Sequence, residues 1–175
     1  MDALIRRLWK YGDDLGRLLR EFGLERAAAA ARAVLGESAP DGEWAAWEMA
    51  VLERVLERIC RYEGDDLPDP ATCDADDAVL AFVQTLPASK RDELRALLAL
   101  IEAGSLVEAP EGERERFTDL SAPAADAYLA TWAESSVGVR RGAFQALKSL
   151  CAMGYWSREE TWHAIGYSVD DNPGI

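Results

Sequence analysis

The sequence predicts an all-α protein, an irregular bundle of about six to eight helices with negligible β-structure. Apolar residues recur at helical spacing along most of the 175 residues. Glycine and proline separate these stretches, as they do between helices. No stretch shows the sustained alternation with β-branched residues that is typical of strands. A chain of this length can bury a core large enough to fold without a metal or a disulfide.

Residues 1–36 are expected to form an N-terminal helical pair. The first helix, over 2–22, repeats leucine at helical spacing. The second, over 25–35, is rich in alanine and is followed by Gly36, which is placed to end it. Residues 37–42 contain proline and glycine. They predict a linker between this pair and the main body.

The main body is expected to span residues 43–167 and to open with the clearest amphipathic helix, over 43–62. One face of this helix carries an apolar stripe, formed by Trp44, Trp47, Val51, Leu52, Val55, Leu56 and Ile59. Glu48, Glu53 and Glu57 lie mostly off that stripe. We interpret them as a solvated helical face rather than a metal cluster.

The next elements are a loop, a short helix and a longer helix. Residues 63–74 are rich in aspartate and proline and predict the loop, and 76–86 predict the short helix. Pro87 suits the first turn of the following helix. That helix is expected to run to Ala103, with Gly104 stopping it.

Three further helices complete the body. A charged loop over 107–119 contains a short turn, and Ser121 with Pro123 then marks a helix start. Residues 138–153 predict the next helix, with its apolar side chains on one face.

Ser157 and Glu160 match a capping box that opens a last short helix over 158–164. Gly166 can close that helix, and residues 168–175 are expected to form an exposed tail.

Acidic residues outnumber basic ones by 32 to 19, which gives a formal net charge of −13. Such a surface repels phosphate backbones and anionic lipid, so we expect neither nucleic acid nor membrane as a partner. Residues 140–175 carry four basic and four acidic side chains, so the whole net charge precedes them. A solvated acidic face that maintains solubility is the ordinary explanation. The alternative is a neutral C-terminal segment that a partner covers.

Cys60, Cys73 and Cys151 are odd in number and include no C-x-x-C pair. They indicate buried free thiols in a reducing compartment rather than a disulfide framework or a zinc site. No apolar stretch of secretory or membrane-spanning length is visible. The sequence therefore favours a cytoplasmic location without membrane insertion.

The single histidine, His163, has no nucleophile linked to it by motif, so a structural or exposed role is expected. Glu160 and His163 match half of a di-iron bundle site, but that site needs a second histidine. Glycine-rich phosphate loops and nucleophile-elbow motifs are absent from the sequence. We therefore expect no catalytic residues, no metal and no cofactor in this chain.

The most unusual stretch is 140–167, which reads RRGAFQALKSLCAMGYWSREETWHAIGY. It concentrates aromatic residues in a segment of neutral charge. One explanation is a helical pair whose aromatics fill the local core. The other is a set of anchors for a partner, because interface centres are enriched in Trp, Tyr and Arg.

This stretch resembles the C-terminal signature of the gluconate 2-dehydrogenase subunit 3 family. The matching positions are Arg141, Phe144, Leu147, Lys148, Tyr155, Trp162, Ala164, Ile165, Gly166 and Tyr167. A similar W-x-A-I-G-Y ending occurs in the helical extension of long-chain alcohol oxidases. Upstream, Leu67, Pro68 and Asp69 resemble the family's short proline-acidic segment. The resemblance covers roughly residues 44–167 and is most specific in the last thirty of them.

The resemblance implies a non-catalytic small subunit. It would bind and stabilise an FAD-dependent large subunit of the glucose-methanol-choline family, which oxidises an alcohol, sugar or sterol hydroxyl. FAD is expected in that partner and not in this chain. The candidate partner-binding residues are Arg141, Phe144, Lys148, Tyr155, Trp156, Trp162 and Tyr167.

Many family members begin with a twin-arginine export signal, which is not visible here. A periplasmic location is therefore expected only if an exported partner carries the chain. The alternative function is a stand-alone helical interaction or chaperone module without a redox partner. The substrate, the electron acceptor and the stoichiometry are not specified by the sequence.

Overall fold

The computed structural model describes residues 24–36, 43–61, 67–108 and 115–167. Within these ranges it contains seven α-helices, one short 3-10 helix and no strand, which confirms the predicted all-α fold. The predicted helix over 2–22, the linker over 37–42 and the tail over 168–175 lie outside the described residues.

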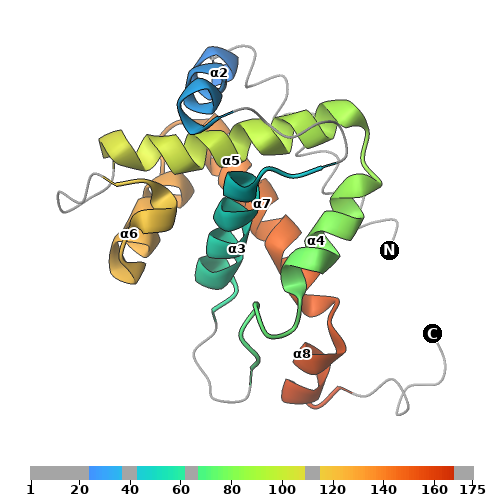
Figure 1. Ribbon diagram of the computed structural model, residues 1–175. Coiled ribbons are helices and arrows are strands. Elements are labelled where there is room, and N and C mark those ends of the chain that lie inside the picture. Colours follow the sequence, from blue (N-terminus) through green and yellow to red (C-terminus); the bar gives the residue numbers. More distant parts are fainter. Residues whose placement is uncertain (1–23, 37–42, 62–66, 109–114, 168–175) are drawn as a thin grey trace.

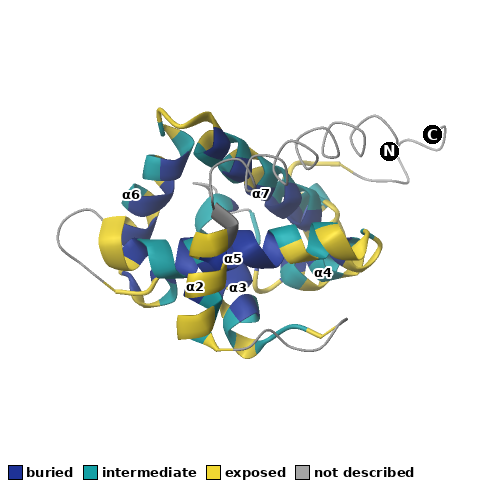
Figure 2. Cartoon of the chain, turned by 90° about the horizontal axis from the view of Figure 1, so that it is seen from above, coloured by how far each residue is buried: buried dark blue, intermediate teal, exposed yellow. Residues whose placement is uncertain are grey.

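The longest described helix, α5 (Ala88–Glu108), runs across the upper part of the molecule in Figure 1. Below it lie α3 (Ala46–Ile59), α4 (Ala75–Gln84) and α7 (Gly138–Trp156). Above it lies α2 (Leu24–Leu35). Figure 2 shows that the outer side of α2 is exposed while the middle of α5 beneath it is buried. The core therefore lies on the side of α5 that faces α3, α4 and α7, and α2 covers the opposite side of α5.

One continuous apolar cluster holds α3, α4, α5 and α7 together, and it also includes the 3-10 helix η2 (Phe117–Asp119) and α6 (Ala122–Ala133). Its largest fully buried side chains are Tyr128, Tyr155, Phe117, Leu52, Leu56, Leu97, Leu98, Ile101 and Leu147. Burying a large apolar side chain stabilises a fold by about 1.5–3 kcal/mol, so this cluster is the main stabilising feature.

Two predicted helix ends are confirmed. Gly36 has φ +101° and follows the last residue of α2. The Ser121 hydroxyl accepts the backbone N–H of Ala124 at 3.4 Å, so it caps α6 as predicted. Both ends follow from local chemistry, which is why the sequence alone identifies them.

Gly104 does not end its helix, because α5 continues through it to Glu108. A Cβ atom at this position would lie 2.5 Å from the hydroxyl oxygen of Tyr128 on α6. Gly104 is therefore a site of close approach between α5 and α6. The prediction of a helix stop there was wrong.

The predicted capping box of the last helix is also wrong. The Ser157 hydroxyl donates to the carbonyl of Gly154 at 2.7 Å instead of capping the next helix. Helix α8 (Glu159–Ala164) begins after Arg158, which makes no side-chain capping bond. Its buried residue is Thr161, whose hydroxyl donates to the Arg158 carbonyl at 2.7 Å and lies 3.4 Å from the carbonyl oxygen of Tyr155 on α7.

Glu48 is fully buried and not part of a solvated face, which corrects its interpretation. Its Oε2 accepts the backbone N–H of Ala45 at 2.8 Å, at the start of α3. Its Oε1 lies 3.8 Å from Nε of the buried Arg95 on α5. A helix N-terminus and an arginine therefore compensate the buried charge. Glu53 is exposed and Glu57 half-buried.

The three cysteines are buried free thiols, as predicted. Burial raises the pKa of the Cys60 thiol to about 12, and proximity to Cys73 adds to the rise. Burial also raises the pKa of Cys151, with Cys60 adding to it. The fold therefore brings together three thiols that are far apart in sequence. Within the described ranges, no helix has both the length and the apolar character needed to cross a membrane.

Candidate functional site

The first three candidate partner-binding residues share one face of α7, because Arg141, Phe144 and Lys148 are spaced by three and four residues. Arg141 and Lys148 are exposed, whereas Phe144 is half-buried and packs against the core. The Arg141 guanidinium donates to the carbonyl of Ser135 in the preceding turn. We call these three residues the α7 stripe.

Tyr155 has no exposed surface. Its hydroxyl donates to the carbonyl of Pro68 at 2.7 Å, which ties the end of α7 to the segment before α4. Tyr155 is therefore a core residue in this structure and not the surface anchor that the sequence suggested. The same bond joins two segments that carry the family resemblance, residues 67–69 and the C-terminal signature.

Trp162, Ile165 and Tyr167 gather at the end of α8, and we call them the α8 tip. Ile165 is 60% exposed and Tyr167 41% exposed, while Trp162 is half-buried. The Trp162 indole N–H donates to the carbonyl of Trp156 at 2.7 Å. The Trp162 and Tyr167 rings meet edge to face, with centroids 5.9 Å apart. The tip thus presents apolar surface on a fixed frame.

The frame of the α8 tip is a Schellman motif, a helix ending with two nested backbone hydrogen bonds. The N–H of Tyr167 donates to the Trp162 carbonyl at 2.9 Å, and the N–H of Gly166 donates to the His163 carbonyl at 3.0 Å. Gly166 has φ +72°, the left-handed conformation that this motif requires. The motif accounts for Trp162, Gly166 and Tyr167 in W-x-A-I-G-Y, but it does not require an isoleucine at 165.

The candidate residues therefore do not form one continuous patch. Arg141 precedes Trp156 by 15 residues along α7, which corresponds to about 22 Å of helix. Trp156 is half-buried and packs edge to face against Tyr155, with ring centroids 5.2 Å apart. The α7 stripe and the α8 tip are separate surfaces. Sequence reasoning did not select Ile165 for partner binding, although its place in the signature was a usable signal.

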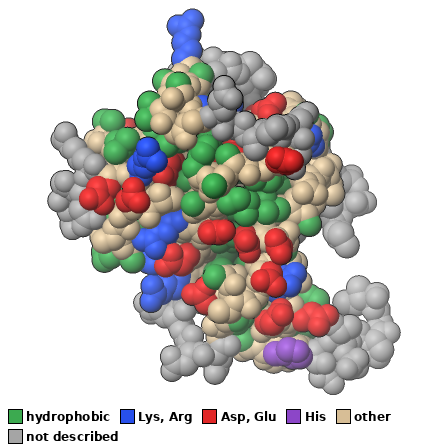
Figure 3. Space-filling model, in the orientation of Figure 1, with side chains coloured by type: hydrophobic (Ala, Val, Ile, Leu, Met, Phe, Trp, Pro, Cys, Tyr) green, Lys and Arg blue, Asp and Glu red, His purple; other side chains and the backbone are tan. Residues whose placement is uncertain are grey.

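Charge is mixed on the face shown in Figure 3, where acidic side chains are spread widely with lysine and arginine among them. His163 and Glu160 on α8 are both exposed. Among the residues that the structure describes, no group of three His, Cys, Asp or Glu side chains could hold a metal ion.

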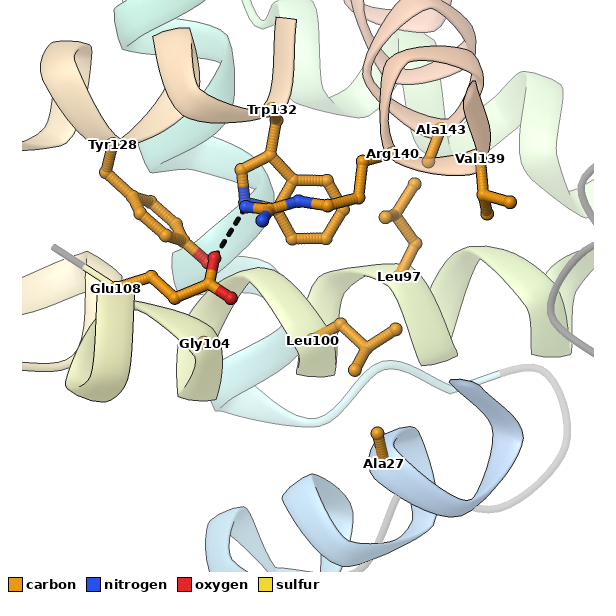
Figure 4. Close-up of a pocket in the computed structure, with 10 residues that line it drawn as sticks. All are labelled: Ala27, Leu97, Leu100, Gly104, Glu108, Tyr128, Trp132, Val139, Arg140 and Ala143. Carbon is orange, nitrogen blue, oxygen red and sulfur yellow. Dashed lines mark ion pairs between the residues drawn. The ribbon is translucent and has the colours of Figure 1, made fainter. Parts of the chain in front are cut away.

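A pocket of about 210 Å³ lies between α5, α6 and α7, with Ala27 of α2 at its edge (Figure 4). Sequence reasoning did not identify it. Its lining consists of Ala27, Leu97, Leu100, Gly104, Glu108, Tyr128, Trp132, Val139, Arg140 and Ala143. The sequence places Tyr128 and Trp132 in the helix that follows Ser121 and in the less specific upstream part of the family resemblance, and it places Gly104 at a helix end.

Comparison of the chain with protein-family models, curated proteins and solved structures found no match. The similarity to the gluconate 2-dehydrogenase subunit 3 family therefore rests on the residues of the sequence itself.

Proposed function

We propose that this chain is the non-catalytic small subunit of an FAD-dependent oxidoreductase of the glucose-methanol-choline family. It binds and stabilises a large subunit that oxidises an alcohol, sugar or sterol hydroxyl and holds the FAD. The observation that carries the proposal is the exposed α8 tip. Ile165 and Tyr167 present apolar surface in the segment that resembles the family signature.

The geometry of the α8 tip suits a docking anchor. The Trp162 N–H is already satisfied within the chain, so covering the indole leaves no unpaired donor. The Schellman motif and the edge-to-face ring contact hold Tyr167 in place before binding. A partner therefore loses little affinity to the ordering of these side chains.

The second support is the contact between the two segments that carry the resemblance. Tyr155 and Pro68 are 87 residues apart in sequence and share a hydrogen bond. In this proposal Tyr155 supports α8 from within the fold. Trp162, Ile165 and Tyr167 form the contact surface, with the α7 stripe as a more distant and more polar contact.

The experiment compares two substitutions that each place an aspartate at the C-terminal end of a helix. Ile165→Asp changes the α8 tip, whereas Val34→Asp changes a similarly exposed aliphatic residue on α2. The tagged full chain is purified from its source cells, and bound protein is assayed for FAD and for oxidation of alcohols, sugars and sterols. We expect a flavoprotein with the wild-type chain and with Val34→Asp, and its loss with Ile165→Asp.

Two outcomes oppose the proposal. Recovery of a specific partner without flavin would favour the alternative of a helical interaction or chaperone module. Equal flavoprotein binding by both variants would remove the α8 tip from the interface. Truncating a central interface anchor typically costs about 2 kcal/mol or more, roughly a thirtyfold loss of affinity.

A further inference from the structure

The pocket between α5, α6 and α7 is lined by two residues whose polar atoms find no hydrogen-bond partner in the part of the chain that the structure describes. The Tyr128 hydroxyl and the Trp132 indole N–H are both buried, and neither makes a hydrogen bond to any described residue. Tyr128 is fully buried and Trp132 is 7% exposed. Unpaired buried donors normally cost free energy, so each needs a reason.

The hydroxyl hydrogen of Tyr128 is the clearest unpaired donor. Burial raises the pKa of this hydroxyl, so it stays protonated throughout the neutral range. The Trp132 ring lies edge to face with the Tyr128 ring, with centroids 6.4 Å apart, and the Trp132 side chain opposes that rise in pKa. Even so, Trp132 can supply only a donor to that oxygen. The hydroxyl hydrogen still has no acceptor among the described residues.

Gly104 adds a second cost at the same place. A glycine inside a helix is about 1 kcal/mol less favourable than alanine. Here it leaves room for the Tyr128 hydroxyl, since a Cβ would lie 2.5 Å from that oxygen. Two unfavourable features thus coincide on one hydroxyl group. This is the pattern expected where a fold maintains a group for binding rather than for its own stability.

Charge at the pocket is already balanced. Arg140 Nη2 pairs with Glu108 Oε2 at 2.7 Å, and the guanidinium lies over the Trp132 ring at 4.7 Å from its centroid (Figure 4). An anionic ligand would meet the Glu108 carboxylate in addition to Arg140. A neutral acceptor oxygen avoids that repulsion and the desolvation of a second charge.

Size limits the ligand to a compact molecule. A cavity of about 150 Å³ lined by apolar side chains can hold benzene, and this pocket has about 210 Å³. Leucine, valine and alanine side chains supply the rest of the surface, from Leu97, Leu100, Val139 and Ala143. The pocket therefore fits one ring with a short substituent.

We propose that this pocket binds a small, neutral, mostly apolar molecule whose carbonyl oxygen accepts hydrogen bonds from the Tyr128 hydroxyl and the Trp132 indole. The proposal does not depend on the flavoprotein partnership. It concerns the opposite end of α7 from the α8 tip, and each can fail without the other.

The test uses three probes of similar shape on the full chain. Acetophenone has a neutral carbonyl, ethylbenzene lacks any acceptor, and benzoate carries a negative charge. Binding is measured by calorimetric titration and by ligand-observed NMR. We expect saturable binding of acetophenone with a Kd near or below about 1 mM, and weaker binding of the other two probes.

Tyr128→Phe removes the hydroxyl and keeps the ring. It should weaken acetophenone binding about three- to tenfold and leave ethylbenzene unchanged. The matched control is Tyr155→Phe, which removes a hydroxyl that is already bonded to Pro68 and should leave probe binding unchanged. The melting temperature of each variant shows that the fold persists.

Three results would overturn the proposal. They are the absence of saturable acetophenone binding, ethylbenzene or benzoate binding at least as tightly, and unchanged acetophenone affinity in a folded Tyr128→Phe variant.

Discussion

The two ends of α7 differ in the hydrogen bonding of nearby aromatic side chains and in the exposure of nearby apolar ones. At the N-terminal end, next to the pocket, the hydroxyl of Tyr128 and the N–H of Trp132 are buried and make no hydrogen bond within the described part of the chain. At the C-terminal end the aromatic polar atoms are paired, Tyr155 to Pro68 and Trp162 to Trp156. That second end instead leaves Ile165 and Tyr167 exposed.

This difference separates two kinds of binding. A concave site with unpaired donors gains from a small ligand that supplies the missing acceptor. A surface with satisfied polar atoms and exposed apolar side chains gains from a partner that covers it. One helix therefore joins two surfaces with different requirements, and substitutions at its two ends should have different consequences.

The largest expected difference in stability is between alanine substitutions at two helix glycines, Gly154 and Gly104, where an added Cβ would meet close neighbours. A Cβ at Gly154 would overlap with Val79 Cγ2 and lie 2.8 Å from the Ala75 carbonyl oxygen, so α4 and α7 would have to separate. We expect Gly154→Ala to lower the free energy of unfolding by about 3 kcal/mol or more. Gly104→Ala meets only the Tyr128 phenol group beside a pocket and should cost about 1–2 kcal/mol.

Chemical denaturation measures both values. The control is Gly142→Ala, also on α7, where no atom lies within 4 Å of the added Cβ. It should stabilise the protein by up to about 1 kcal/mol, because alanine favours helix more than glycine does. If Gly154→Ala and Gly104→Ala lower the free energy of unfolding equally, the pocket gives the Tyr128 phenol group no room to move.

Gly104 also shows where sequence reasoning reaches its limit. A glycine after an apolar run signals a helix end when the chain turns there, as Gly36 does with φ +101°. The same residue type inside α5 is explained by the Tyr128 hydroxyl, 24 residues further along the chain. Local spacing predicts the helices because periodicity is a local property. It does not report which distant atom a residue will meet.

The same limit explains the errors at Glu48 and Tyr155. Glu48 pairs with Arg95 on another helix, and Tyr155 bonds to Pro68, so each is buried through a contact distant in sequence. The W-x-A-I-G-Y ending is different, because its Schellman motif lies within six residues. The pocket was missed because its lining comes from four helices.

The two buried tyrosine hydroxyls should contribute differently to the free energy of unfolding. Tyr155→Phe breaks the bond to Pro68 and should lower the free energy of unfolding by about 1–1.5 kcal/mol. Tyr128→Phe removes a hydroxyl without a partner among the described residues and should leave stability unchanged or raise it slightly. Thermal and chemical unfolding of both variants give the values. A loss at Tyr128 as large as that at Tyr155 would mean that its hydroxyl is bonded in the free protein.

A smaller effect is expected at the Schellman motif. Gly166 has φ +72°, so alanine there is strained and should cost about 1 kcal/mol of local stability. Because α8 is a six-residue helix at the edge of the fold, the change should appear in α8 before it affects the core. Hydrogen exchange should show faster exchange of the Tyr167 N–H, with the α5 amides unchanged. Uniformly faster exchange would contradict a local role for the motif.

The smallest expected effect on stability is that of Ile165→Asp. With 60% of its surface exposed, Ile165 contributes little to the core, and the added aspartate meets only a modest unfavourable helix dipole at the end of α8. The free energy of unfolding should therefore change by less than about 0.5 kcal/mol. Val34 lies at the end of α2 and is 66% exposed, so Val34→Asp should change the free energy of unfolding of the isolated chain equally little. A loss above about 1.5 kcal/mol at position 165 alone would show that the side chain stabilises α8 against the body of the fold. If both variants have the melting temperature of the wild type, any loss of flavoprotein binding by Ile165→Asp is a property of the surface, because the fold beneath it is unchanged.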